Sequence, residues 1–238
     1  MFLVACDRDS SFDCIQKAGT IIKEEIPITP FEKVLVNRDI QLSIEEGQSF
    51  KVVLETGENL INDIDVKVTG DQLQLTDNNT CNFIRDYGIT KVFVTAPNLT
   101  EIRTSSQYTV SSVGTLNYES LKLLSEDSVA PDLFTVGDFN LDIKTNQLDI
   151  ISNNISSFYI SGTTESLFVG FYAGIGRFEG ENLIAEQVSI FHRGSNDMIV
   201  HAVESLSGEL RGTGNVIVVN QPTFINVDQL YTGSLILN

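Results

Sequence analysis

Apolar and polar residues alternate with period two along the first half of the chain. The alternating runs are separated by Gly, Asp and Asn, which are typical of turns. They comprise residues 34–36, 40–44, 50–54, 64–68, 72–75 and 91–94. Because period two places every second side chain on the same face, these runs predict β-strands with one buried face. A short helix is expected only near residues 59–63.

The second half of the chain carries a repeat of longer period. Each repeat opens on an apolar residue, and successive openings are about 20 residues apart. The opening residues are Leu121, Leu148, Leu167, Val188, Leu206 and Val227. A circuit of this length holds two or three short strands and their corners. The pattern therefore predicts an all-β fold, a single-stranded parallel β-helix (β-solenoid) with more irregular strands at its N-terminal end.

Small residues mark the expected corners near the C-terminus. These turn residues are Gly194, Ser195, Gly212, Thr213, Gly214, Gly233 and Ser234. In the expected register, the three hydroxyl residues stack as a ladder beside a tight glycine corner. Arg193 and Arg211 then stack as well, with Asp197 and Glu209 as the acids available to offset their charges.

An aromatic stretch before these corners is the candidate ligand surface. Rings that alternate outward would form a flat surface for sugars or another protein, whereas inward rings would fill the core. Both alternatives stay open, and His192 is expected on an outer face beside Arg193. The candidate surface residues are Phe168, Phe171, Tyr172, Phe178, His192, Arg193 and Arg211.

Composition narrows the classes of partner. Of the 238 residues 42% are hydrophobic and 20% charged, which suits a chain with a buried core. The formal net charge of -17 comes from 32 acidic against 15 basic residues. An acidic surface repels phosphate backbones, so nucleic acid is excluded as a partner, and the expected partner is an envelope or extracellular glycan or protein.

The N-terminal residues predict an address in the cell envelope. Leu3-Val4-Ala5-Cys6 resembles the lipobox of bacterial lipoproteins, in which Cys6 would carry the lipid. We therefore expect residues 1–6 to be a residual signal peptide and lipobox, and residues 7–25 a flexible leader. Residues 26–238 would form one β-solenoid domain, with strands over 26–96 and regular turns over 97–238. The expected location is the outer membrane, periplasmic or surface-exposed, with the lipid as its only membrane contact.

The remaining cysteines and acids predict little chemistry. Cys14 and Cys81 are a candidate disulfide in an oxidising compartment, and two unpaired thiols are the alternative. The spacing of cysteines and histidines does not fit a zinc site. No cofactor is expected, although Asp and Asn at the corners leave calcium open. The sequence also lacks the hydrolase, metalloprotease and nucleotide-binding motifs, so a non-enzymatic role is expected.

The order of motifs resembles a known family. The motifs are PFEKV (30–34), DIQL (39–42), NLINDI (59–64), GDQLQL (70–75) and VFVTAPNL (92–99). With the Gly-Ser/Thr-Gly-Asn/Asp corners, they resemble the bacteroidete head GIN domain family of auto-transporter adhesins. The resemblance implies a right-handed β-solenoid lipoprotein of the outer envelope, with no catalytic residues to carry over. Residues 125–127 and 153–155 depart from the family's corners.

Three functions are compatible with these patterns. The first is a non-enzymatic, lipid-anchored envelope protein that presents an extended acidic solenoid face for adhesion or for binding glycan or protein. The second is a polysaccharide-active enzyme of the pectinase-like β-helix class, which a neighbouring acidic pair in a groove would favour. The third is a structural scaffold that stacks end to end through an uncovered terminal turn.

Overall fold

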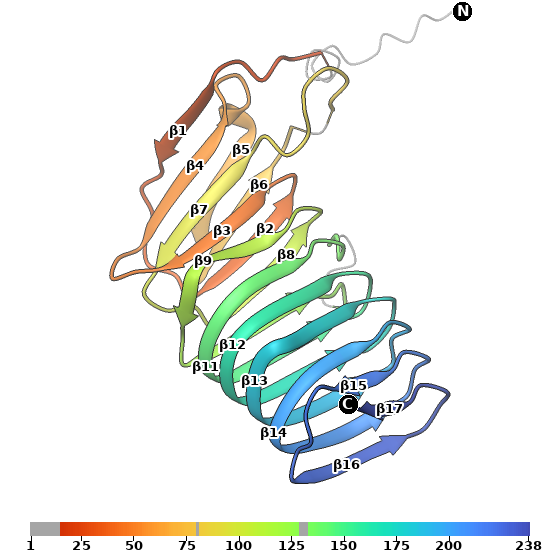
Figure 1. The fold of residues 1–238 in the computed structure, drawn as a ribbon. Coiled ribbons are helices and arrows are strands. Elements are labelled where there is room, and N and C mark those ends of the chain that lie inside the picture. Colours follow the sequence, from red (N-terminus) through yellow and green to blue (C-terminus); the bar gives the residue numbers. More distant parts are fainter. Residues whose placement is uncertain (1–14, 80, 129–132) are drawn as a thin grey trace, which may run out of the picture.

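The computed structural model describes residues 15–79, 81–128 and 133–238 (Figure 1). These residues form β-strands and one 3₁₀ turn, and no α-helix occurs among them, so the all-β prediction is confirmed. The first ten strands are β1 (Ile21–Glu25), β2 (Lys33–Arg38), β3 (Gln41–Glu46), β4 (Lys51–Gly57), β5 (Ile64–Thr69), β6 (Gln72–Asp77), β7 (Lys91–Ala96), β8 (Glu101–Ser106), β9 (Val110–Asn117) and β10 (Ser120–Ser125). The others are β11 (Phe139–Ser152), β12 (Ser157–Phe171), β13 (Arg177–His192), β14 (Met198–Leu210), β15 (Val216–Val218), β16 (Phe224–Gln229) and β17 (Leu235–Leu237). The 3₁₀ turn, η1 (Ile61–Asp63), lies where a short helix was expected.

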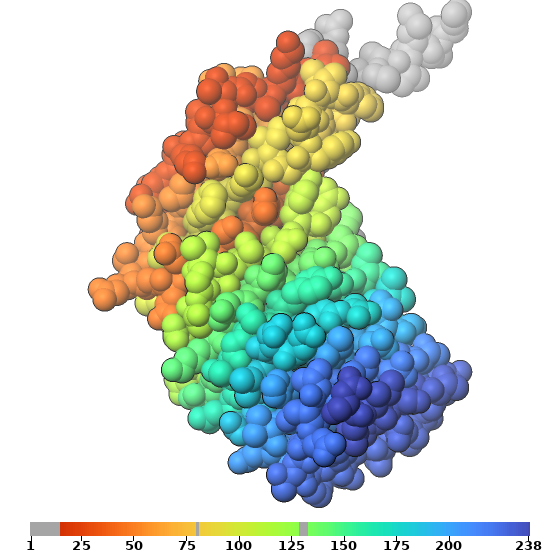
Figure 2. Space-filling view, viewed as in Figure 1, coloured from red at the N-terminus to blue at the C-terminus, as the bar shows by residue number. Residues whose placement is uncertain are grey.

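The strands form one curled sheet with the outline of a half-barrel (Figure 1). In its N-terminal part, one row of paired strands runs β1–β4–β7–β3–β9. A second row runs β5–β6–β2–β8–β10. Both rows join at β11, because β9 pairs with its first half and β10 with its second half. The space-filling view shows one elongated body with the N-terminal strands at one end and the last turns at the other (Figure 2).

The N-terminal strands do not stack in the order of the chain. β2 pairs in parallel with both β6 and β8, and β3 pairs in parallel with both β7 and β9. Strand β2 is therefore inserted between β6 and β8, and β3 between β7 and β9, although β2 and β3 come first in the sequence. Antiparallel strands β1, β4 and β5 complete this end. Alternation predicted where β2 to β7 lie but held no information on their order.

From β10 onward the strands stack in chain order and in parallel. Leu121, Leu148, Leu167, Val188 and Leu206 lie in one row of successive partners, as the repeat predicted. The row continues at Ile225, which pairs with Leu206. Val227 was the wrong choice for this position, because it pairs with Gly208. The error arose because apolar residues alternate in β16, so a shift of two residues preserves the pattern.

The core lies between the two rows and continues through the long strands. Phe139, Phe158, Phe178 and Met198 occupy one register and are fully buried. The Phe139 and Phe158 rings stack with centroids 4.9 Å apart. Since strand spacing is about 4.8 Å, identical inward positions on successive strands are held at stacking distance.

The leader is part of the folded body from residue 15 onward. Ile21–Glu25, which the sequence assigned to a flexible leader, pairs as β1 with β4. Just before it, the backbone N–H of Asn59 donates to the Ala18 carbonyl, and the Glu58 N–H donates to the Thr20 carbonyl. Residues 15–25 therefore lie along the N-terminal end of the sheet. Among the described residues, no helix is long and apolar enough to cross a membrane.

Candidate functional site

A two-residue connection between the two rows lies beneath a hollow at the edge of the sheet. β2 passes to β3 through Asp39 and Ile40 alone. Residues 78–90 join β6 to β7 on one side of this corner. On the other side, residues 107–109 join β8 to β9, and residues 126–138 next join β10 to β11. Because β2 is inserted between β6 and β8, two short corners lie side by side between two much longer loops. The described residues 79, 81–90 and 133–138 of these loops form walls, and the short corners form the floor.

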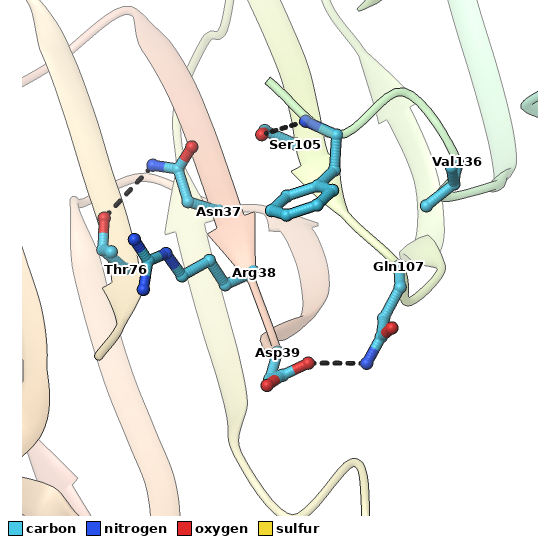
Figure 3. Close-up of a pocket in the computed structure, with 8 residues that line it drawn as sticks. Asn37, Arg38, Asp39, Thr76, Ser105, Gln107 and Val136 are labelled. Atoms are coloured by element: carbon cyan, nitrogen blue, oxygen red, sulfur yellow. Dashed lines mark hydrogen bonds between the residues drawn. The ribbon is translucent and has the colours of Figure 1, made fainter. Parts of the chain in front are cut away.

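An open pocket of about 620 Å³ occupies this hollow (Figure 3). Its lining residues come from β6, β2 and β8, from the corners that follow β2 and β8, and from the loop after β10: Asn37, Arg38, Asp39, Thr76, Ser105, Gln107, Phe134 and Val136. Arg38 has a φ of 59°, and it is the one non-glycine residue with positive φ in the described part of the chain. This left-handed conformation costs an L-residue about 1–2 kcal/mol, and here it permits the tight turn.

Hydrogen bonds fix the polar side chains of the pocket. Asn37 Nδ2 donates to Thr76 Oγ1 at 3.1 Å and to the Leu75 carbonyl at 3.3 Å. Gln107 Nε2 donates to Asp39 Oδ1 at 2.5 Å. Figure 3 shows Arg38 directed toward Thr76 and Asp39 directed toward Gln107, so the cation and the carboxylate serve different sides of the pocket.

The carboxyl group of Asp39 has a perturbed acidity. Burial, followed by the charge of Asp77, raises the pKa of Asp39 above its ordinary value. The nearby Arg38 and Arg85 guanidinium groups and the hydrogen bond from Gln107 lower it in part. A carboxylate that is held in place and incompletely solvated is a strong acceptor for a ligand hydroxyl.

A second pocket of about 310 Å³ adjoins the first and shares Asp39 with it. It is lined mainly by the 78–90 loop, which carries Phe83 and Tyr87. These rings are 79% and 74% exposed, and Phe134 on the opposite wall is 55% exposed. Together the two pockets form the corner groove, a polar floor with aromatic rings on both walls.

The predicted aromatic surface divides into buried and outer residues. Phe171, Phe178 and His192 are completely buried, so the prediction that they contact a ligand is wrong. Each lies at an inward position of its strand, in register with buried residues above and below. The expectation that His192 stands on an outer face fails for the same reason.

Phe168 and Tyr172 lie on the outer side of the sheet, as one alternative proposed. A Cβ at Gly170 would come within 2.9 Å of both rings, so the two side chains cover that glycine. Phe191, which the sequence analysis did not single out, stacks on Tyr172 with centroids 4.9 Å apart. The rings therefore cover the sheet and each other, and none of them lines either pocket of the corner groove.

The interior position of His192 determines its protonation state. Burial lowers the pKa of His192, and this effect exceeds the opposing influence of the Asn196 backbone and the Asp197 charge. The Gly194 N–H donates to Nδ1 at 3.4 Å, which requires an unprotonated Nδ1. His192 is thus a neutral core residue beneath the 193–197 corner.

The C-terminal corners stack closely, with one shift from the predicted register. Three five-residue corners, 193–197, 211–215 and 230–234, separate aligned strand ends. Ser195 therefore aligns with Thr213 and then with Thr232, not with Ser234. Gly212, Gly214 and Gly233 fit because a Cβ on any of them would lie within 2.1 Å of a carbonyl oxygen in the preceding corner.

The two corner arginines are exposed. Arg211 forms an ion pair with Glu209, one of the two acids proposed for this role. Asp197, the other acid, instead accepts hydrogen bonds from the backbone and side chain of Asn215 at 3.0 Å. These polar groups tie one corner to the next and leave a solvated edge.

The structure describes only part of the predicted cysteine chemistry. Cys81 is disulfide-bonded. Cys14, its predicted partner, and Cys6, the predicted lipid site, both lie outside the described residues, so the pairing and the lipidation stay predictions. Within residues 15–79, 81–128 and 133–238, no three His, Cys, Asp or Glu side chains gather as a metal-binding group.

Comparison with known proteins identifies the family. Residues 30–222 match the family model described as "Putative auto-transporter adhesin, head GIN domain". No curated protein matches the chain.

Solved structures share the fold at low sequence identity. A putative adhesin from Bacteroides fragilis is 18% identical with a TM-score of 0.83, and the match covers 94% of this chain and 100% of that chain. A putative lipid binding protein from Parabacteroides distasonis is 14% identical with a TM-score of 0.62, covering 92% and 97%. A putative adhesin from Parabacteroides merdae is 14% identical with a TM-score of 0.61, covering 93% and 98%. The chain belongs to the head GIN domain family.

Proposed function

We propose that this protein is a non-enzymatic, adhesin-like protein of the cell envelope that binds a glycan in the corner groove. The observation that carries the proposal is the groove itself: a polar floor around Arg38 and Asp39 between walls with exposed Phe134, Phe83 and Tyr87. Pyranose rings present C–H faces that pack on aromatic rings and hydroxyls that pair with polar side chains. The groove offers both kinds of contact within one hollow.

Membership of the family supports an adhesive role, and the stacked parallel strands support a rigid binding surface. We infer that the strands form a right-handed β-solenoid with about 20 residues per circuit. The parallel registers between β10 and β14 support this inference. A rigid frame lowers the ordering cost of binding. A lipid on Cys6 would hold the protein at the outer membrane, and the acidic surface would keep it apart from anionic neighbours.

The alternative of a polysaccharide-active enzyme has one observation in its favour. Asp39 and Asp77 lie close enough for their charges to interact at the groove. However, Asp77 Oδ1 accepts from the backbone and side chain of Asn79, and Oδ2 accepts from Thr90 Oγ1 at 2.8 Å. A carboxylate bonded in this way stabilises the 78–90 loop. A pair for acid–base catalysis needs two groups that can reach the substrate.

A glycan array with the full chain tests the proposal. We expect binding to one class of glycan, without release of sugar ends, in the presence and in the absence of calcium. Phe134→Ala should abolish or strongly weaken the signal, because it removes the exposed ring from the groove. The matched control is Phe224→Ala, which removes a phenylalanine of similar exposure (57%) from β16, far along the chain from the groove.

Two results would contradict the proposal. Equal binding by the Phe134→Ala and Phe224→Ala variants would place the ligand elsewhere. Release of sugar ends that disappears in Asp39→Asn would instead establish the enzyme.

A further inference from the structure

We propose that the corner pocket selects a neutral sugar residue over a sugar acid, with Arg38 donating to one hydroxyl and Asp39 accepting from another. This inference rests on the proposed glycan-binding function and names the ligand class of the same site. It follows from counting the hydrogen-bonding capacity that the pocket leaves unused.

Three acceptor atoms in the pocket remain available. Asn37 uses its Nδ2, Gln107 uses its Nε2, and Asp39 uses its Oδ1 in the hydrogen bonds already described. Among the described residues, no hydrogen bond reaches Asn37 Oδ1, Gln107 Oε1 or Asp39 Oδ2. Each is an acceptor that a ligand can satisfy only by donating a proton.

The pocket also has donors. Arg38 is exposed, and in the described part of the chain it takes part in no ion pair. The Thr76 hydroxyl already accepts from Asn37, and the Ser105 hydroxyl accepts from the Phe134 N–H at 2.8 Å. Both hydroxyl hydrogens are free to point into the pocket. The pocket therefore offers both donors and acceptors.

This mixture fits hydroxyl groups and does not fit a carboxylate. A sugar hydroxyl donates one hydrogen bond and accepts others, so it can pair with either the donors or the acceptors of the pocket. A carboxylate only accepts, so it would leave nearby acceptors of the pocket unpaired and cost their desolvation. It would also approach Asp39 and Asp77 in a protein whose formal net charge is -17. The Arg38 and Arg85 guanidinium groups oppose this repulsion, and Arg85 already donates to the Asn79 and Cys81 carbonyls.

The walls complete the fit to a neutral ring. The Phe134 ring offers an apolar face beside Val136, against which the C–H face of a pyranose can pack. The pocket volume of about 620 Å³ lies in the range of sites for small organic ligands. The adjoining pocket beyond Asp39 leaves room for further residues of an oligosaccharide.

The test compares matched pairs of oligosaccharides on the full chain. The probes are galactose oligomers against galacturonate oligomers, and mannose oligomers against mannuronate oligomers, titrated at neutral pH. We expect the neutral member of at least one pair to bind at least tenfold more tightly than its acid. Asp39→Asn should weaken that binding about tenfold, because a hydrogen bond to a charged acceptor is lost.

Arg38→Asn provides a second variant with an intact backbone, because Asn tolerates the left-handed conformation at this position. It should also weaken neutral binding about tenfold, whereas Phe224→Ala should leave it unchanged. Thermal midpoints confirm that each variant is folded.

The outcomes separate the inference from the function on which it rests. Tighter binding of an acidic oligomer, with a gain on Asp39→Asn and a loss on Phe134→Ala, would overturn the neutral ligand and keep the groove as a glycan site. If no pair binds, or if Phe134→Ala binds as Phe224→Ala does, the proposed function and this inference both fail.

Discussion

Both halves of this protein are built from strands with alternating apolar residues, but they differ in the order of the strands and in the length of the connections. In the C-terminal half, each long strand from β11 to β14 pairs with its predecessor, and the corners between these strands have four or five residues. In the N-terminal half, β2 and β3 are inserted between later strands, and the connections range from two residues to thirteen. In the regular C-terminal half, successive corners stack closely on one another. The corner groove forms where strand order and loop length are both irregular.

This contrast separates the stacked strands β11 to β14 from the candidate binding site. In the stacked strands, a local distortion affects the neighbouring strand, because each backbone lies against the next. An inserted strand with a short corner leaves a hollow that longer loops can line with functional side chains. Three sets of variants test this contrast, from the largest expected effect to the smallest.

Gly162→Ala should destabilise the protein far more than Gly70→Ala. A Cβ at Gly162 in β12 would lie 1.9 Å from the Ile143 carbonyl oxygen of the neighbouring strand β11, and the φ of Gly162 is +111°. Gly70, in the β5–β6 turn, has a φ of +64° with nothing within 4 Å of a Cβ. We expect losses of roughly 3–5 kcal/mol and about 1 kcal/mol, measured by urea unfolding. Equal losses would mean that the stacked half is as tolerant as the irregular half.

Acid should destabilise the protein through the core histidine. The folded pKa of His192 is lowered from 6.5, so the unfolded chain binds a proton at a pH where the native side chain does not. Stability is therefore full above about pH 6.5 and falls as the pH drops below it, by up to about 1.4 kcal/mol per pH unit. Unfolding titrations between pH 7.5 and 5 measure this slope.

His192→Leu, which matches Leu210 in the same row, should reduce the slope over this range. A slope that does not change in the variant would assign the acid sensitivity to other groups.

Arg38→Gly should stabilise the fold slightly while weakening ligand binding. Glycine removes the strain of φ 59°, and its larger unfolded-state entropy offsets part of the gain, leaving about 0.5–1 kcal/mol. Arg193→Gly is the matched change at a C-terminal corner, where the residue does not have positive φ, and it should lower stability instead. Thermal unfolding compares the two. A loss of stability on Arg38→Gly would show that the arginine side chain stabilises the corner more than its backbone strains it.

The sequence predicted local structure better than long-range order. Alternation located β2 to β7, and the row from Leu121 to Leu206 follows from the spacing of apolar residues. The same register aligns His192 with Phe171 and Leu210. These two apolar partners are the signal that would have predicted the burial of His192. The insertion of β2 between β6 and β8 depends on pairing between distant segments, which alternation does not specify.

The candidate site was missed for the same reason. Asn37, Arg38 and Asp39 are three successive polar residues between the alternating runs 34–36 and 40–44, which is an ordinary turn signal. Their significance depends on Phe134 and Gln107, which lie about 70 to 100 residues later and reach the same corner only through strand insertion. Exposed aromatics in two long loops were the available hint. The candidate surface predicted from the sequence lay instead in the aromatic-rich stretch near Phe168, with a core role as the open alternative, and there the rings mainly cover the sheet.

Hydrogen exchange of the full chain, with and without the tightest-binding oligosaccharide from the array, tests the division between frame and site most directly. The account predicts slower exchange in residues 37–40, 76–90, 105–109 and 133–137. It also predicts no change in the corners 172–176, 193–197 and 211–215. Protection centred on those C-terminal corners, with the groove unchanged, would contradict the account.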